Sequence, residues 1–148
     1  MATIRREVRI GRPAEQVWAI VGDPGTIQDW FPGIVDSTVE GSTRTITLAS
    51  GVPLAEEIVT NDPILRRFQY RIEGGFFRQH LGTVDVIGLD DDSCLAVYST
   101  DAEPDVMALV IGGAAGNALH ELQRQFESGR HDDGPARSGM ATSDGSIH

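Results

Sequence analysis

The polar residues best placed for chemistry lie in segments that alternate apolar and polar side chains. In LAEEI, Glu56 shares a strand face with Leu54 and Ile58, so its carboxylate is expected among inward apolar neighbours. In FQYRI, the same alternation turns Phe68 and Tyr70 inward. A carboxylate in apolar surroundings either finds a hydrogen-bond partner or has its ionised form disfavoured, and it then suits general acid or base catalysis.

His80 and Tyr98 extend this group. His80 opens a strand in which Val84 and Val86 share its parity, so it is expected near one end of an internal cavity, where it can carry a proton. Structural roles compete with each assignment. Glu56 can pair with an arginine or with the Tyr70 hydroxyl, His80 can be a partly exposed strand-end residue, and Tyr98 can be a core tyrosine with a satisfied hydroxyl.

Signals for cofactors and metals are missing. The sequence contains no phosphate-binding P-loop, no Gly-x-Gly-x-x-Gly after a strand and no pair of histidines at ligand spacing. We therefore expect no cofactor and no metal. The run Asp90-Asp91-Asp92 is typical of a solvated hairpin turn, and Cys94 in CLAVY of an unreactive core thiol.

The elements that must position these residues follow from periodicity and turn signals. Strands are expected at Thr3–Ile10, Ile34–Glu40, Thr43–Leu48, Leu54–Thr60, Leu65–Glu73, His80–Leu89 and Cys94–Thr100. Helices are expected after Pro13, within Asp23–Pro32, and from Pro104 to about Phe126. This order predicts an α+β fold in which a curved seven-stranded antiparallel sheet wraps around a long C-terminal helix, with two short helices between strands 1 and 2. The concave space between sheet and helix is the expected ligand site.

The terminal helix contains the unusual stretch VIGGAAGNALHEL. A helical wheel places Ile111, Ala115 and Leu119 on the face toward the sheet, where the small alanines leave room for a ligand. Gly112 and Gly116 lie on a flank, which predicts a shallow groove open to the loop 74–79 or to another subunit. His120 points away from the core.

Length and charge limit the possible functions. A chain of 148 residues suits one domain, assigned to residues 1–128, with a disordered tail at 129–148 that is rich in Gly, Ser and Asp. The formal net charge of −10 argues against binding to nucleic acid and against stable membrane association. A single cysteine, no signal segment and no long apolar run predict a cytoplasmic protein.

Three segments carry a resemblance to a known superfamily: PAEQVWAIVGDPGTIQDWFPGI at residues 13–34, LAEEIVTNDPILRRFQYRIEGG at residues 54–75, and the terminal helix. They resemble the helix-grip fold of the START-related (SRPBCC) superfamily, in particular its bacterial polyketide cyclase/dehydrase and lipid-transport branch. The resemblance implies an internal ligand cavity with Trp30 bordering its entrance. Because proteins of this fold include aromatases, cyclases, carriers and toxin-like proteins, it leaves the activity open.

The sequence therefore predicts a protein that binds a small hydrophobic or aromatic molecule in an internal cavity. In an enzymatic version, polyketide cyclase/dehydratase-like acid-base chemistry would rest on Glu56 and His80. The expected ligand-binding residues are Trp30, Leu54, Phe68, Tyr70, Tyr98, Ile111, Ala115 and Leu119. A non-catalytic lipid or small-molecule carrier or sensor, and a toxin-like regulatory protein, are the alternatives, and a homodimer remains open.

Overall fold

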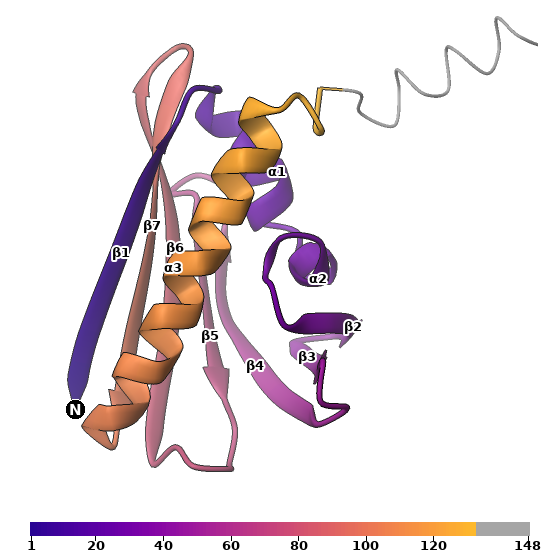
Figure 1. Cartoon of the computed structure of the whole chain (residues 1–148), viewed down its shortest axis with the longest axis vertical. Coiled ribbons are helices and arrows are strands. Elements are labelled where there is room, and N and C mark those ends of the chain that lie inside the picture. Colours follow the sequence, from indigo (N-terminus) through magenta and orange to yellow (C-terminus); the bar gives the residue numbers. More distant parts are fainter. Residues whose placement is uncertain (133–148) are drawn as a thin grey trace, which may run out of the picture.

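A curved antiparallel sheet of seven strands frames the protein, and one long helix crosses its inner face (Figure 1). The computed structural model describes residues 1–132. The strand order across the sheet is β1-β7-β6-β5-β4-β3-β2. In chain order the elements are β1 (Ala2–Ile10), α1 (Ala14–Val21), η1 (Pro24–Thr26), α2 (Ile27–Trp30), β2 (Ile34–Glu40), β3 (Thr43–Leu48), β4 (Pro53–Asp62), β5 (Arg67–Ile72), β6 (Gln79–Asp90), β7 (Ser93–Glu103) and α3 (Asp105–Glu127).

This architecture confirms the predicted α+β helix-grip fold. Strands β2 and β3 have the predicted bounds, and β1, β4, β6 and β7 each begin one residue earlier than expected. Strand β5 starts later, at Arg67, because the preceding turn is held by Asp62, whose carboxylate accepts hydrogen bonds from the backbone N–H groups of Ile64 and Leu65. Arg66 ends this turn in the left-handed region, with φ of 55°.

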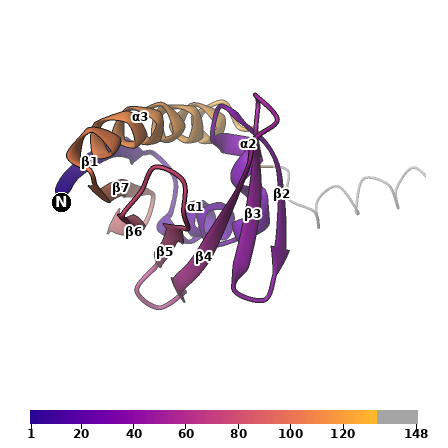
Figure 2. The same ribbon diagram turned by 90° about the horizontal axis from the view of Figure 1, so that it is seen from below.

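The short helices close one end of the sheet, and the core lies between the helices and the inner face. Helix α1 buries Ala14, Val17 and Val21, which recur at helical spacing. Helix α2 buries Ile27 and Trp30. Seen from below, the sheet forms an open arc beneath α3, and α2 lies beside β2 at the far end (Figure 2). The side chains of β3, β4, β5 and β7 that point into this arc are therefore brought to one space.

Helix α3 approaches β1 closely at Gly112 and Gly116. A Cβ atom at Gly112 would lie 2.5 Å from Cγ2 of Ile4, so only glycine allows this contact. At Gly116, a Cβ atom would lie 3.5 Å from the Arg6 side chain. The flank groove predicted for the loop 74–79 or another subunit is thus filled by β1, which corrects that prediction. The reason is the strand order, which places β1 at the sheet edge beside β7 and under α3.

The first residues of the predicted tail make defined contacts with the end of α3. The backbone N–H of Gly129 donates to the carbonyl of Phe126, and that of Arg130 donates to the carbonyl of Gln125. The His131 ring packs on the Phe126 ring, with ring centroids 4.5 Å apart. The rest of the tail, 133–148, lies outside the described residues. Within residues 1–132, no helix combines the length and apolar character needed to cross a membrane.

Candidate functional site

A mostly apolar cavity of about 200 Å³ lies between the inner face of the sheet, the chain after α2, and α3. We call it the inner cavity. Four polar side chains reach it, those of Arg44, Glu56, Tyr70 and Tyr98, which come from β3, β4, β5 and β7. The remaining lining residues are Ile27, Phe31, Pro32, Gly33, Ile34, Ile46, Leu48, Leu54, Ile72, Ile111 and Ala114. An apolar space with a few convergent polar groups is the usual form of a small-molecule site.

Arg44 and Glu56 form a buried ion pair at the wall of this cavity. Arg44 Nε donates to Glu56 Oε1 at 2.7 Å, and each side chain is only 3% exposed. A second guanidinium nitrogen, Nη1, donates to the Pro24 carbonyl at 3.2 Å. The guanidinium also lies over two aromatic rings, 5.2 Å from the centroid of Phe68 and 5.1 Å from that of Tyr70. These contacts compensate two charges that burial alone would make costly.

The carboxyl among the lining residues of the inner cavity is that of Glu56, and its pKa is shifted. Burial raises its pKa above the ordinary value, and the attraction and hydrogen bond of Arg44 offset only part of this effect. The side chain of Glu56 therefore points inward as predicted. Of the two structural partners considered for it, an arginine and the Tyr70 hydroxyl, the structure shows an arginine, Arg44. The sequence carries a signal for Arg44, because Arg44 has the same strand parity as Ile46 and Leu48. Glu56 has the same parity as Leu54 and Ile58 in the same way.

Tyr70 and Tyr98 meet across the inner face, and their hydroxyls are hydrogen-bonded to each other. Burial is the main cause that raises the pKa of each phenol above its ordinary value, so both remain neutral donors at ordinary pH. One hydroxyl donates its proton to the oxygen of the other. The accepting hydroxyl keeps its own proton, which it can donate to a ligand. Gly82 makes this pairing possible, because a Cβ atom there would lie 2.5 Å from the Tyr70 ring.

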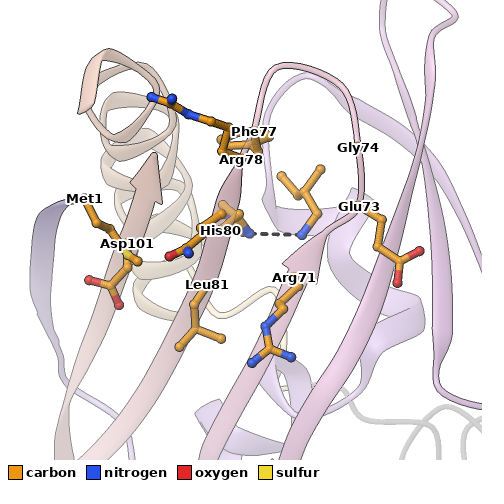
Figure 3. A pocket seen from close by; sticks show the side chains of 11 residues that line it. Met1, Arg71, Glu73, Gly74, Phe77, Arg78, His80, Leu81 and Asp101 are labelled. Atoms are coloured by element: carbon orange, nitrogen blue, oxygen red, sulfur yellow. Dashed lines mark hydrogen bonds between the residues drawn. The ribbon is translucent and has the colours of Figure 1, made fainter. Parts of the chain in front are cut away.

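His80 is buried but does not line the inner cavity. It is 5% exposed and lies between the rings of Tyr70 and Phe77, with centroid distances of 5.4 and 5.0 Å. Its Nδ1 accepts a hydrogen bond of 3.0 Å from the backbone N–H of Ile72, drawn as the dashed line in Figure 3. Burial lowers its pKa from 6.5 to about 4, with Asp101 opposing the shift, so the ring is neutral at ordinary pH. Among the described residues, its Nε2 has no hydrogen-bond partner.

The aromatic residues near α2 divide between the cavity and its surroundings. Phe31 lines the inner cavity, whereas Trp30 is buried behind it and packs against Tyr98 with ring centroids 6.4 Å apart. Phe68 lies under the Arg44 guanidinium and also outside the lining. Trp30 and Phe68 are therefore neighbours of the polar lining residues. Since α2 ends at Trp30, the next residue, Phe31, continues in an extended conformation and turns toward the cavity.

The remaining predicted ligand-binding residues also divide. Leu54 and Ile111 line the inner cavity. Ala115 and Leu119 are fully buried one and two turns further along α3, outside its lining. Ala114, the neighbour of Ala115 in the sequence, is the small α3 residue that borders the cavity.

The residues outside the cavity show no arrangement typical of a metal centre. Within residues 1–132, no group of three or more His, Cys, Asp or Glu side chains lies close enough to hold a metal ion. Asp90 to Asp92 form the β6–β7 hairpin turn, where the Asp90 carboxylate accepts from the backbone N–H of Asp92 and from the Ser93 hydroxyl. Burial raises the pKa of the Cys94 thiol, which argues against a nucleophilic thiolate.

Several solved structures share this fold. The protein XoxI from Bacillus cereus is 25% identical, with a TM-score of 0.79 over 85% of this chain and 96% of that chain. The di-domain ARO/CYC protein BexL from the BE-7585A biosynthetic pathway is 17% identical, with a TM-score of 0.74 over 86% of this chain and 47% of that chain. Norcoclaurine synthase from Thalictrum flavum, solved in complex with dopamine and hydroxybenzaldehyde, is 19% identical, with a TM-score of 0.68 over 86% of this chain and 87% of that chain.

The sequence comparison places the chain in a family. No curated protein matches the sequence. The model of the family described as polyketide cyclase/dehydrase and lipid transport matches residues 1–127, which include every strand and helix of the fold. The chain therefore belongs to the polyketide cyclase/dehydrase and lipid transport family.

Proposed function

We propose that the inner cavity binds a small hydrophobic or aromatic molecule that carries a hydrogen-bond acceptor. The observation that supports this most strongly is the pairing of an apolar lining with the Tyr70–Tyr98 hydroxyl pair. A dry apolar cavity of about 150 Å³ is enough to bind benzene, so about 200 Å³ suits a substituted aromatic ring. The free hydroxyl proton of the tyrosine pair would then donate to a carbonyl oxygen of the ligand.

An enzymatic function would use the same groups. The tyrosine hydroxyl would polarise the ligand carbonyl, and the carboxylate of Glu56, whose basicity burial increases, would accept a proton from the adjacent carbon. His80 lies behind Tyr70 and outside the cavity lining, so in this proposal it acts through the position of Tyr70. The folds of an ARO/CYC protein and of norcoclaurine synthase, whose structure holds two small aromatic molecules, support an aromatic carbonyl substrate.

A non-catalytic carrier or sensor is the second candidate, and one observation favours it. Glu56 already accepts a 2.7 Å hydrogen bond from Arg44, so its carboxylate is held by a structural partner and is less available as a base. The polar groups would then only orient the ligand. A toxin-like regulator that acts through its surface needs no internal cavity, so the cavity in the described part of the chain disfavours this alternative.

Filling the cavity from α3 tests ligand binding directly. Ala114→Leu adds an isobutyl side chain to the lining and should weaken binding of acetophenone at least about tenfold, measured by isothermal titration calorimetry. Gly113→Ala is the matched control on the same helix, because a Cβ atom there meets nothing within 4 Å. It should leave the affinity unchanged. Equal affinities for Ala114→Leu and the wild type would contradict the proposed site.

The enzyme and the carrier differ in what happens to a bound carbonyl compound. If the site is catalytic, an added poly-β-ketone mimic should be converted to a cyclised or dehydrated product, and Tyr98→Phe should reduce the rate at least about tenfold through the lost hydroxyl. Native mass spectrometry and product analysis on the same sample provide the measurement. Recovery of the mimic unaltered, still bound to the protein, would rule out this chemistry and favour the carrier.

A further inference from the structure

The inner cavity shares a wall with a second, larger space. An outer cleft of about 580 Å³ lies where the ends of β5 and β6 meet their connecting loop (Figure 3). Its lining residues are Met1, Arg71, Ile72, Glu73, Gly74, Phe77, Arg78, Gln79, His80, Leu81 and Asp101. Ile72 lines both spaces and is only 9% exposed. The side chain of Ile72 is therefore part of the partition between them.

A side chain holds this partition closed where the sheet ladder stops. The β5–β6 pairing ends at Tyr70 and Gly82, although β5 continues to Ile72 and β6 begins at Gln79. Beyond that point the Ile72 N–H is satisfied by Nδ1 of His80 and not by a backbone carbonyl. A lone side-chain bond is easier to open than a continuous ladder, because no neighbouring ladder bonds have to break with it.

The β5–β6 loop contains the features of a movable cover. Gly74 and Gly75 both have positive φ, 73° and 67°, a backbone conformation that other residues rarely adopt. Phe77 rests on the His80 ring, while Phe76 is 82% exposed. One phenylalanine thus covers the partition and the other is left in solvent at the loop tip. The loop lies outside the paired part of β5 and β6, and its end is fixed to β7 where the backbone N–H of Arg78 donates to the Glu103 carbonyl at 2.8 Å.

We propose that the inner cavity and the outer cleft are the two ends of one elongated ligand site, joined when the Ile72 side chain and the Phe77–His80 contact move aside. This inference rests on the proposed function and extends it from a single ring to an amphipathic molecule. Ligand sites of drug-sized molecules span about 300–1,000 Å³, a range that the outer cleft reaches by itself and that the inner cavity reaches only when joined to it.

The lining of the outer cleft indicates the chemistry of the ligand's outer end. Arginines and acidic residues alternate around it, and the arginines have partners: Arg71 lies 3.7 Å from Glu57, and Arg78 lies 3.6 Å from Glu103. The acidic lining residues Glu73 and Asp101 match the two arginines in number, so the cleft has no excess of either charge and selects neither an anion nor a cation. A neutral hydrogen-bonding group, such as a hydroxyl or an amide, fits this surface, while the aromatic or apolar end occupies the inner cavity.

Two probes and two variants test the inference. The short probe is acetophenone, and the long probe is acetophenone bearing a hydroxyl-terminated octyl chain at the para position. Ile72→Ala removes the shared partition. Ile46→Ala removes the same atoms from a residue that lines only the inner cavity.

We expect the long probe to bind Ile72→Ala at least about tenfold more tightly than Ile46→Ala, and to associate faster with it. The affinities of the two variants for acetophenone should differ by less than about threefold. Calorimetry gives the affinities, and stopped-flow tryptophan fluorescence gives the rates.

Other outcomes would overturn the proposal. Equal affinities of the long probe for the two variants would show that the partition does not limit the site. If acetophenone binds and the long probe binds none of the proteins, the elongated site is wrong and the proposed function stands. If acetophenone does not bind the wild type, the proposed function itself fails. Should Ile72→Ala not fold, Phe77→Ala removes the other part of the partition from a partly exposed loop position and must show the same selective gain.

Discussion

Glu56→Leu should lower the free energy of unfolding by about 3–5 kcal/mol, the usual cost of leaving one member of a buried ion pair without its partner. The Arg44 guanidinium is 3% exposed and would keep only its bond to the Pro24 carbonyl and its contacts with two aromatic rings. Urea unfolding followed by circular dichroism measures the change.

Two controls separate burial from charge. The double variant Arg44→Met/Glu56→Leu should recover stability to within about 1 kcal/mol of the wild type, because it removes both buried charges and restores apolar packing. Glu57→Leu is the surface counterpart. Its partner Arg71 lies 3.7 Å away and both side chains are about half exposed, so the loss should stay below about 1 kcal/mol. If Glu56→Leu lowered the free energy of unfolding no more than Glu57→Leu, the buried ion pair would contribute no more to stability than the surface pair.

The double variant also shows what the ion pair contributes to function. If the protein folds equally well without Arg44 and Glu56, their charges are not needed for the fold. Acetophenone binding to this stable variant then depends on the tyrosine pair and the apolar lining alone. A loss of turnover with retained binding would assign the Arg44–Glu56 pair to chemistry, whereas unchanged behaviour in both measurements would leave the pair a purely structural role.

Most of the fold could be predicted because it follows from local patterns. Alternation fixed which side chains of β4, β5 and β7 face inward, so Glu56, Tyr70 and Tyr98 were placed on the correct face. Turn residues marked the ends of the strands. The close packing of Gly112 on Ile4 was not predictable, since it depends on which strand lies at the sheet edge beneath α3. Such contacts join residues distant in sequence, and periodicity carries no information about them.

The candidate site was only partly predictable for a similar reason. Parity tells which face of the sheet a side chain occupies but not how far along the strand the cavity extends. It therefore predicts the same inward orientation for His80 and Tyr70, although only Tyr70 lines the inner cavity. Arg44 is not predicted as a site residue, because the alternation in TRTITL does not show that its side chain pairs with Glu56 on the neighbouring strand. The partition at Ile72 depends on where the β5–β6 ladder stops, and the sequence contains no signal for that point.

Acidification should destabilise the wild type more than His80→Asn. Burial lowers the pKa of His80 to about 4 in the folded protein, from 6.5. Between these two values the unfolded chain binds more protons than the folded protein, so stability falls as the pH falls through this window and levels off below about pH 4. A change of the pKa from 6.5 to about 4 corresponds to about 3 kcal/mol. Urea unfolding of both proteins at about pH 7 and about pH 4 measures it.

The choice of substitution separates titration from hydrogen bonding. The side-chain oxygen of asparagine in His80→Asn can replace Nδ1 as acceptor for the Ile72 N–H, whereas His80→Leu leaves that buried donor unsatisfied, at a further cost of about 1–3 kcal/mol. Both variants should lack the wild-type loss between about pH 6.5 and about pH 4, because neither side chain titrates there. Parallel curves for the wild type and His80→Asn would show that His80 is not the linked group. Protonation at Nδ1 turns the acceptor into a donor facing the Ile72 N–H, so the same acidification should loosen the partition between the two cavities.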